Sequence, residues 1–178
     1  MTGMTALRHV LSILLLPTTV AIVVPCLILS SRPTGSGAWP ASTPLGLVSI
    51  LAGIGVIATG LGLICTTVWQ FATRGRGTLA PWDPPQRLVV AGVYRYVRNP
   101  MISGVVLVLL GEALVMRSGA VLEWAVGFFV LNAIYIPLLE EWGLERRFGD
   151  AYREYKAHVP RWVPRATAWE PPVKEHPC

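Results

Sequence analysis

The chain has 178 residues, of which 53% are hydrophobic and only 14% charged, and its formal net charge is +5. Soluble domains carry about 25% charged residues, so this composition indicates an integral membrane protein of a single domain. The basic residues flank apolar runs instead of forming a stripe, which argues against nucleic-acid binding. The three cysteines and three histidines lack pairing or metal-ligand spacing, so neither a disulfide framework nor a metal site is predicted.

Four apolar segments follow in chain order, at residues 10–31, 45–71, 101–116 and 121–139. The first two hold no charged residue, and the other two hold one carboxylate each. A signal peptide is the competing interpretation of the first segment, but its apolar run is longer than a typical signal core. We therefore expect an all-α integral membrane fold of about four transmembrane helices. Pro17 and Pro25 are expected to bend the first helix, which membrane helices tolerate.

Glycines are concentrated in the second segment, at positions 53, 55, 60 and 62. Their small surfaces favour close packing against another helix. The third segment is short for a bilayer core of about 30 Å at about 1.5 Å per residue, so its end is expected to lie near the interface.

The distribution of lysine and arginine predicts the orientation. Thirteen of these fifteen residues precede the first segment, lie between the second and third, or follow the fourth. The other two loops hold only Arg32 and Arg117. The positive-inside rule then places both termini and all the polar segments in the cytosol.

A polar stretch separates the second and third apolar segments. Its prolines, at positions 81, 84 and 85, forbid a continuous helix, and long irregular loops are often functional. Its last part is basic and aromatic and leads directly into the third segment. There Asn99 can cap the helix and Pro100 fits its first turn. A juxtamembrane basic segment with aromatic anchors has the same composition.

The chain becomes amphipathic after the fourth apolar segment, from Glu140 onward. Tyr152 and Tyr155 are three residues apart and share a helical face. The prolines at positions 160 and 164 end the structured part, so we predict a cytosolic amphipathic helix, one domain over residues 1–165 and a disordered tail over 166–178.

Two polar clusters are thus expected on the same side of the membrane. The helix start at Asn99 offers free N–H groups and a positive dipole end, which suit an anion. Glu140 and Glu141 suit a cation, although adjacent residues point about 100° apart, so at most one faces a given pocket. The pair also fits a solvated interfacial site beside Arg146 and Arg147. Together the clusters fit a zwitterionic cofactor with a positive centre.

Both clusters resemble a known signature. Residues Gly92-Val-Tyr-Arg-Tyr-Val-Arg-Asn-Pro-Met-Ile-Ser-Gly104 are similar to the Gly-x-Tyr…Arg-His-Pro-x-Tyr-x-Gly pattern of isoprenylcysteine carboxyl methyltransferases and related phospholipid methyltransferases. The second half of that signature resembles Glu140-Glu141-x-x-Leu144…Phe148-Gly149-x-x-Tyr152-x-x-Tyr155…Val159-Pro160-Arg161. Both halves occur in the family order over residues 86–164.

The resemblance implies that S-adenosyl-L-methionine binds on the cytosolic side, between the first motif and the glutamate pair. The cofactor-binding residues that it implies are Gln86, Arg87, Leu88, Val89, Tyr94, Arg98, Asn99, Pro100, Met101, Ile102, Gly104, Glu140 and Glu141. On the side of the methyl acceptor it implies Tyr135, Tyr155 and Arg161.

Three departures from the family pattern bear on the substrate. Asn99 stands where the family has histidine, so no titrating histidine base is present there. Ile102 replaces a tyrosine and removes a hydroxyl. The arginine with which prenylcysteine enzymes bind a carboxylate is replaced by the segment 135–137, which favours a lipid or another hydrophobic acceptor. No catalytic residue is assigned.

Two functions from different classes follow. The first is a membrane methyltransferase that takes a lipophilic acceptor from the bilayer. The second is a non-enzymatic small four-helix membrane protein, such as a transporter or an accessory factor. Proton-coupled transporters typically place a carboxylate in the middle of an early span, and the first two segments here have none.

Overall fold

The computed structural model describes residues 18–31, 42–70, 73, 88 and 90–170. Within these residues the regular structure is helical and no strand occurs, so the predicted all-α fold is confirmed. The elements are η1 (Thr19–Val23), α2 (Val24–Ser31), α3 (Pro44–Gln70), η3 (Gly92–Arg95), α4 (Pro100–Met116), α5 (Gly119–Tyr135), η4 (Ile136–Glu140), α6 (Glu141–Phe148) and α7 (Asp150–His158).

Two helices are long and apolar enough to cross a membrane, α3 and the continuous helix Gly119–Phe148 that joins α5, η4 and α6. The described part of the first apolar segment, Thr19–Ser31, and the helix Pro100–Met116 are shorter. Four complete spans therefore stay a prediction.

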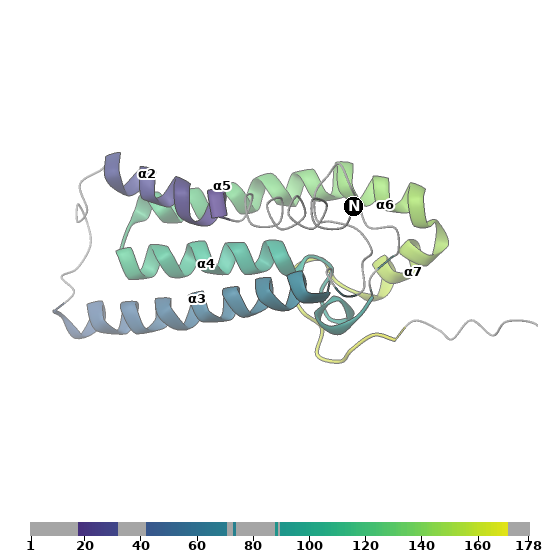
Figure 1. Cartoon of the computed structure of the whole chain (residues 1–178), viewed down its shortest axis with the longest axis horizontal. Coiled ribbons are helices and arrows are strands. Elements are labelled where there is room, and N and C mark those ends of the chain that lie inside the picture. The colour runs from purple at the N-terminus through teal and green to yellow at the C-terminus, as the bar shows by residue number, and fades with distance from the viewer. Residues whose placement is uncertain (1–17, 32–41, 71–72, 74–87, 89, 171–178) are drawn as a thin grey trace, which may run out of the picture.

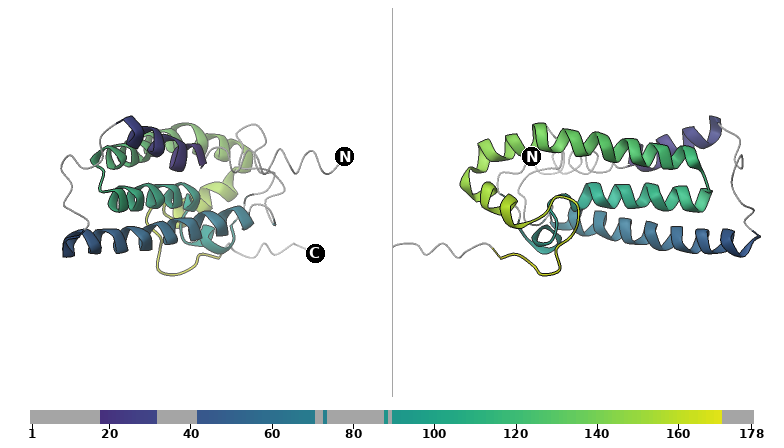
Figure 2. Two further views of the ribbon diagram at one scale, coloured as in Figure 1. Left: turned by 60° about the vertical axis from the view of Figure 1, so that its left-hand side comes forward. Right: turned by 180° about the vertical axis from the view of Figure 1, so that it is seen from behind.

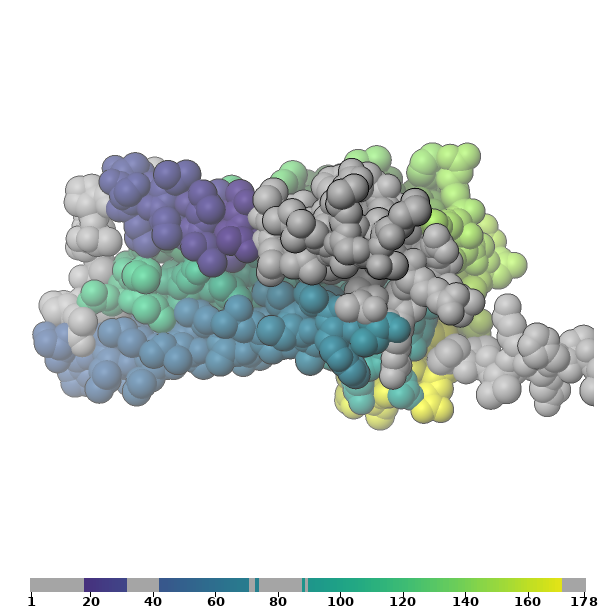
Figure 3. All heavy atoms as spheres, in the orientation of Figure 1, coloured from purple at the N-terminus to yellow at the C-terminus, as the bar shows by residue number. Residues whose placement is uncertain are grey.

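The apolar helices lie roughly parallel in layers. α4 lies between α3 on one side and the layer of α2 and α5 on the other (Figure 1). The space-filling view shows α2, α4 and α3 in this succession on one face (Figure 3). α6 and α7 extend beyond one end of these layers and turn back toward the start of α4 (Figure 2). The polar motifs are therefore gathered at one end of the apolar helices.

Glycines bring the backbones of α3 and α4 into direct contact. A Cβ atom on Gly60 would lie 2.6 Å from the carbonyl oxygen of Gly104, and one on Gly53 would lie 2.7 Å from that of Gly111. By contrast, a Cβ atom on Gly55 or on Gly62 would meet nothing within 4 Å. Close approach of this kind is how helices associate in lipid, where no hydrophobic driving force acts between them.

A side chain of α5 connects this helix to the irregular turn that precedes α2. The indole nitrogen of Trp124 donates to the carbonyl oxygen of Val20 at 3.1 Å. Val20 lies in η1, a π-helical turn, and such turns change the hydrogen-bonding pattern of the backbone. Val20 and Trp124 also pack against a small apolar core, which contains Ala21, Val105, Val108, Leu109 and Ala125.

The fourth apolar segment ends in the π-helical turn η4, which contains Pro137 and leads directly into α6. Proline lacks an N–H group, and π turns often occur near functional sites. The chain reverses between α6 and α7 at Gly149, whose φ of +54° favours glycine. This reversal brings α7 back toward the segment that precedes α4.

Candidate functional site

The segment before α4 is compact. Gly92 opens η3 with a φ of +52°, and the side chain of Tyr94 is buried. Pro100 occupies the first turn of α4, as predicted. The predicted cap is not formed, because the Asn99 side chain accepts no hydrogen bond from the helix start. Its amide nitrogen is buried and has no hydrogen-bond partner within the described part of the chain.

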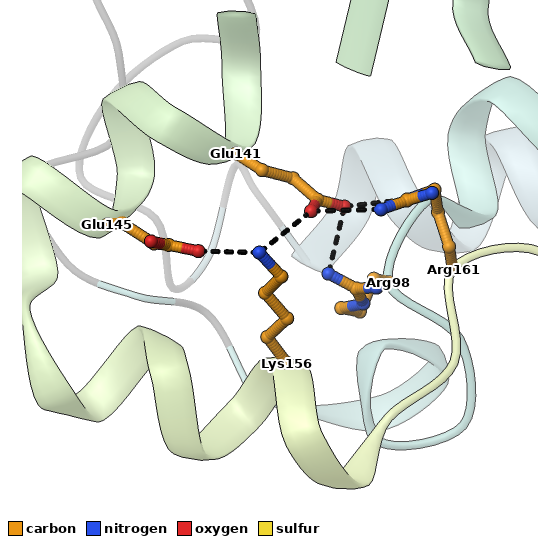
Figure 4. A network of polar contacts seen from close by, with 5 residues as sticks. All are labelled: Arg98, Glu141, Glu145, Lys156 and Arg161. Carbon is orange, nitrogen blue, oxygen red and sulfur yellow. Dashed lines mark hydrogen bonds and ion pairs between the residues drawn. The ribbon is translucent and has the colours of Figure 1, made fainter. Parts of the chain in front are cut away.

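Glu141 is the centre of a charged network that joins the two predicted motifs (Figure 4). Nη1 of Arg98 donates to Oε1 of Glu141 at 2.9 Å. Arg161 donates to the same carboxylate through Nε at 2.7 Å and through Nη2 at 3.0 Å. Lys156 lies 3.4 Å from Oε2 and bridges to Glu145 at 2.6 Å. The carboxylate thus faces three cations, one from the segment before α4 and two from the C-terminal part of the chain.

This network is largely shielded from solvent. The side chain of Glu141 is 3% exposed and that of Arg98 is 9% exposed. Arg161 and Lys156 lie nearer the surface. The hydrogen bond from Lys156 to Glu145 raises the pKa of the lysine, and the charge of Glu141 adds to the shift. A buried carboxylate requires such partners, because its desolvation is costly unless it is paired.

The C-terminal strap, residues 159–170, runs beside the segment that precedes α4. Backbone hydrogen bonds join Arg98 to Pro160 at 2.9 Å, Arg165 to Tyr96 at 3.0 Å and Trp169 to Arg95 at 3.0 Å. Five residues of the predicted disordered tail, 166–170, belong to this strap. Trp169 stacks on His158 with ring centroids 5.5 Å apart, and this contact explains why residues 166–170 pack onto the domain. Residues 171–178 lie outside the described residues.

A tyrosine cluster supports the same segment from the side of α7. The hydroxyl of Tyr155 donates to the carbonyl oxygen of Tyr94 at 2.7 Å. Tyr152 and Tyr155 are buried with Val159, and Leu88 and Trp169 pack against them. Burial raises the pKa of Tyr152 to about 12 and raises that of Tyr155 further. Both phenols are therefore neutral at physiological pH.

The structure distributes the other predicted residues over several environments. Met101 and Ile102 are half-buried in the first turn of α4, whereas Gly104 packs against α3. Tyr135 is 47% exposed at the end of α5. The predicted cofactor residues Gln86, Arg87 and Val89 lie outside the described residues.

The two glutamates of the predicted pair differ. Glu141 is saturated by cations, whereas Glu140 forms no hydrogen bond and no ion pair with any described residue. Glu140 nevertheless lies close enough to Tyr94 to affect it. Burial raises the pKa of Tyr94, and the negative charge of Glu140 adds to this shift. The charge of Glu140 therefore acts on a residue of the first motif.

Two buried polar residues at the end of α3, Thr67 and Gln70, were not singled out from the sequence. The signal that marks Gln70 is an amide at the end of an otherwise apolar segment. Trp169 was also missed, because it lies in the segment predicted as a tail.

Comparison with known families agrees with the two motifs. The sequence model described as "Phospholipid methyltransferase" matches residues 48–151, which include most of α3, all of α4 and α5, and the glutamate pair. Neither a curated protein nor a solved structure matches the chain. The match covers more than half of the 178 residues, and it includes the first motif and the beginning of the second. The chain therefore belongs to the phospholipid methyltransferase family.

Proposed function

We propose that this protein is a membrane methyltransferase that uses S-adenosyl-L-methionine and methylates a lipophilic acceptor from the bilayer. One observation carries the proposal. The buried ion pair between Arg98 and Glu141 joins the two halves of the family signature into one site. Family membership supports methyl transfer, and two long apolar helices support the membrane setting.

The described residues fit the polar groups of this cofactor, which carries a carboxylate, an ammonium group and a sulfonium. Two donors near the start of α4 have no partner within the described ranges, Nε of Arg98 and Nδ2 of Asn99. The free N–H groups of the first helical turn add to them and, with the helix dipole, favour an anion. We therefore assign the carboxylate of the cofactor to this helix start.

Of the glutamate pair, we assign the cationic end of the cofactor to Glu140. Glu141 already faces Arg98, Arg161 and Lys156, so a further cation would have to compete with three that are part of the fold. Glu140 has no such partner among the described residues, and its charge acts on Tyr94 in the first motif. Glu141 is then a positioning residue, which holds Arg98 beside the helix start.

The three residues predicted on the side of the methyl acceptor differ in their contacts. Arg161 binds Glu141, and Tyr155 binds the backbone of Tyr94, so we assign both to positioning. Tyr135 is exposed at the end of α5 and is the one of the three that we place beside the acceptor.

The cofactor supplies a methyl group that its sulfonium already activates. What remains for the protein is to align donor and acceptor and to exclude water. The family description and the apolar helices favour a lipid acceptor that enters from the bilayer. We further propose that the site faces the cytosol, because thirteen of fifteen basic residues lie on that side of the predicted topology.

The experiment that tests the proposal is a titration of S-adenosylhomocysteine into the purified protein in detergent. Saturable binding is expected, and its absence would sink the proposal. Incubation with radiolabelled S-adenosyl-L-methionine and extracted membrane lipids then identifies the acceptor by transfer of label into the lipid fraction. A non-enzymatic role predicts no such transfer.

A further inference from the structure

Two polar side chains, three residues apart, are buried at the end of α3, and they differ in whether their hydrogen-bonding groups have partners. Thr67 is fully buried, and its hydroxyl donates to the carbonyl oxygen of Leu63 at 2.7 Å. Gln70 is 5% exposed, and its carbonyl oxygen Oε1 has no hydrogen-bond partner among the residues that the structure describes. A buried carbonyl without a partner is unfavourable, so such atoms are rare and call for an explanation.

The amide of Gln70 lies directly against the first motif. A Cβ atom built on Gly92 would meet Nε2, Cδ and Oε1 of Gln70 at 2.5 to 2.7 Å. Gly92 has a φ of +52° and begins the turn that carries Tyr94. Glycine is therefore needed at this position for two reasons, the backbone conformation and the space that the amide fills. This contact holds Gln70 at the first motif, where the cofactor is proposed to bind.

The unpartnered atom on Gln70 complements the unpartnered atoms of the motif that Gly92 begins. Arg98 and Asn99 offer hydrogen-bond donors without partners in the described ranges, whereas Gln70 offers an acceptor. A ligand that carries both a carboxylate and N–H or O–H donors would satisfy all of them. The amide oxygen of Gln70 is uncharged, so it forms no ion pair with the sulfonium. A neutral hydrogen-bond acceptor therefore suits a cofactor that loses its positive charge during methyl transfer.

We propose that Gln70 is a binding residue for the methyl donor and that its carbonyl oxygen accepts a hydrogen bond from an N–H or O–H group of that molecule. This inference rests on the proposed function. It extends the site from the segment before α4 and the glutamate pair to the end of α3, the helix that packs against α4. Gly92 then has a role in the site through the amide that it accommodates.

The test is a set of binding titrations with S-adenosylhomocysteine on the full-length protein in detergent. Gln70→Met keeps the length of the side chain and removes the acceptor, and Gln70→Leu removes it with a different shape. Either variant that folds is expected to bind about tenfold more weakly, the usual effect of one lost hydrogen bond. Gln70→Glu retains an oxygen acceptor and is expected to bind within about threefold of the unmodified protein.

Thr67→Val is the matched control, because it removes a buried polar group whose hydrogen bond is already made within α3. Its affinity is expected to stay within about twofold of the unmodified protein. The inference is overturned if Gln70→Met or Gln70→Leu binds as well as the unmodified protein, which is also the result expected if only a buried water satisfies Oε1. It is equally overturned if Thr67→Val weakens binding as much. Absence of binding by the unmodified protein would instead overturn the proposed function.

Discussion

The guanidinium of Arg98 donates to the carboxylate of Glu141 at 2.9 Å, although the two residues are 43 positions apart in the sequence. Arg98 lies two residues before the start of α4, and Glu141 begins α6. Their contact joins the segment before α4 to the start of α6, which neither motif specifies alone. The consequences of this relationship can be measured separately for stability and for binding.

Glu141→Gln is expected to destabilise the protein. Removal of the charge leaves the buried guanidinium of Arg98 without its counter-ion, and the loss of one partner of a buried ion pair costs roughly 3–5 kcal/mol. Thermal unfolding in detergent should show a clearly lower midpoint. A midpoint within 2 °C of the unmodified protein, roughly the shift from 1 kcal/mol or less, would show that the pair is not important for the fold.

Glu140→Gln is expected to behave in the opposite way. Glu140 has no ion pair among the described residues, so the midpoint of unfolding should change little. The affinity for S-adenosylhomocysteine should fall, because the proposed ligand of the cofactor's cationic end has lost its charge. An unchanged affinity would exclude Glu140 from the cofactor site.

Gly60→Ala is expected to disturb the contact between α3 and α4. The new methyl group would lie 2.6 Å from the carbonyl oxygen of Gly104, and overpacking of this kind costs about 1–3 kcal/mol. Gly62→Ala is the matched control, since nothing lies within 4 Å of its Cβ position and alanine favours the helix. Thermal unfolding of both variants checks the prediction, which fails if they are equally stable.

Tyr155→Phe tests the support that α7 gives to the segment before α4. The variant loses the 2.7 Å hydrogen bond to the carbonyl oxygen of Tyr94, a net change of about 1 kcal/mol. Tyr135→Phe removes a hydroxyl at an exposed position and should leave the unfolding midpoint unchanged. Equal midpoints for the two variants would mean that the buried hydrogen bond contributes nothing measurable.

The tyrosine cluster also predicts how stability depends on alkaline pH. Burial raises the pKa of Tyr152 from its ordinary value near 10 to about 12 in the folded protein. Between these values the folded state holds the phenol proton and the unfolded state releases it, so stability is complete below pH 10 and falls as the pH rises toward 12. Tyr155 acts in the same direction. Unfolding midpoints measured across this window should fall, and less steeply in Tyr152→Phe than in the unmodified protein.

The helices themselves were largely predictable. The segment predicted at 45–71 is the helix Pro44–Gln70, and the segment at 101–116 is the helix Pro100–Met116. Such helices can be predicted from the sequence because an uninterrupted run of apolar residues is enough to indicate them, without knowledge of distant contacts. The fourth helix continues past its predicted end at 139 through η4 into α6. A change to polar residues marks the end of an apolar run but does not by itself end a helix.

The contacts between helices required the tertiary structure. Four glycines of α3 offered equivalent surfaces in the sequence, yet Gly53 and Gly60 face α4 and Gly55 and Gly62 do not. The choice depends on the direction from which α4 approaches, and no local pattern contains it. The same holds for Trp169, whose ring contacts lie on α7.

By itself the sequence determined the helical class, the positions of the apolar segments and the two motifs that identify the family, since each depends on residues close together in the chain. The tertiary structure decided which member of the glutamate pair forms ion pairs within the protein, because Arg98, Lys156 and Arg161 reach Glu141 from distant positions in the sequence. It also decided that the amide of Gln70 lies on Gly92, at the start of the first motif. Both are long-range contacts, and only the packing of one helix end against another brings such side chains together.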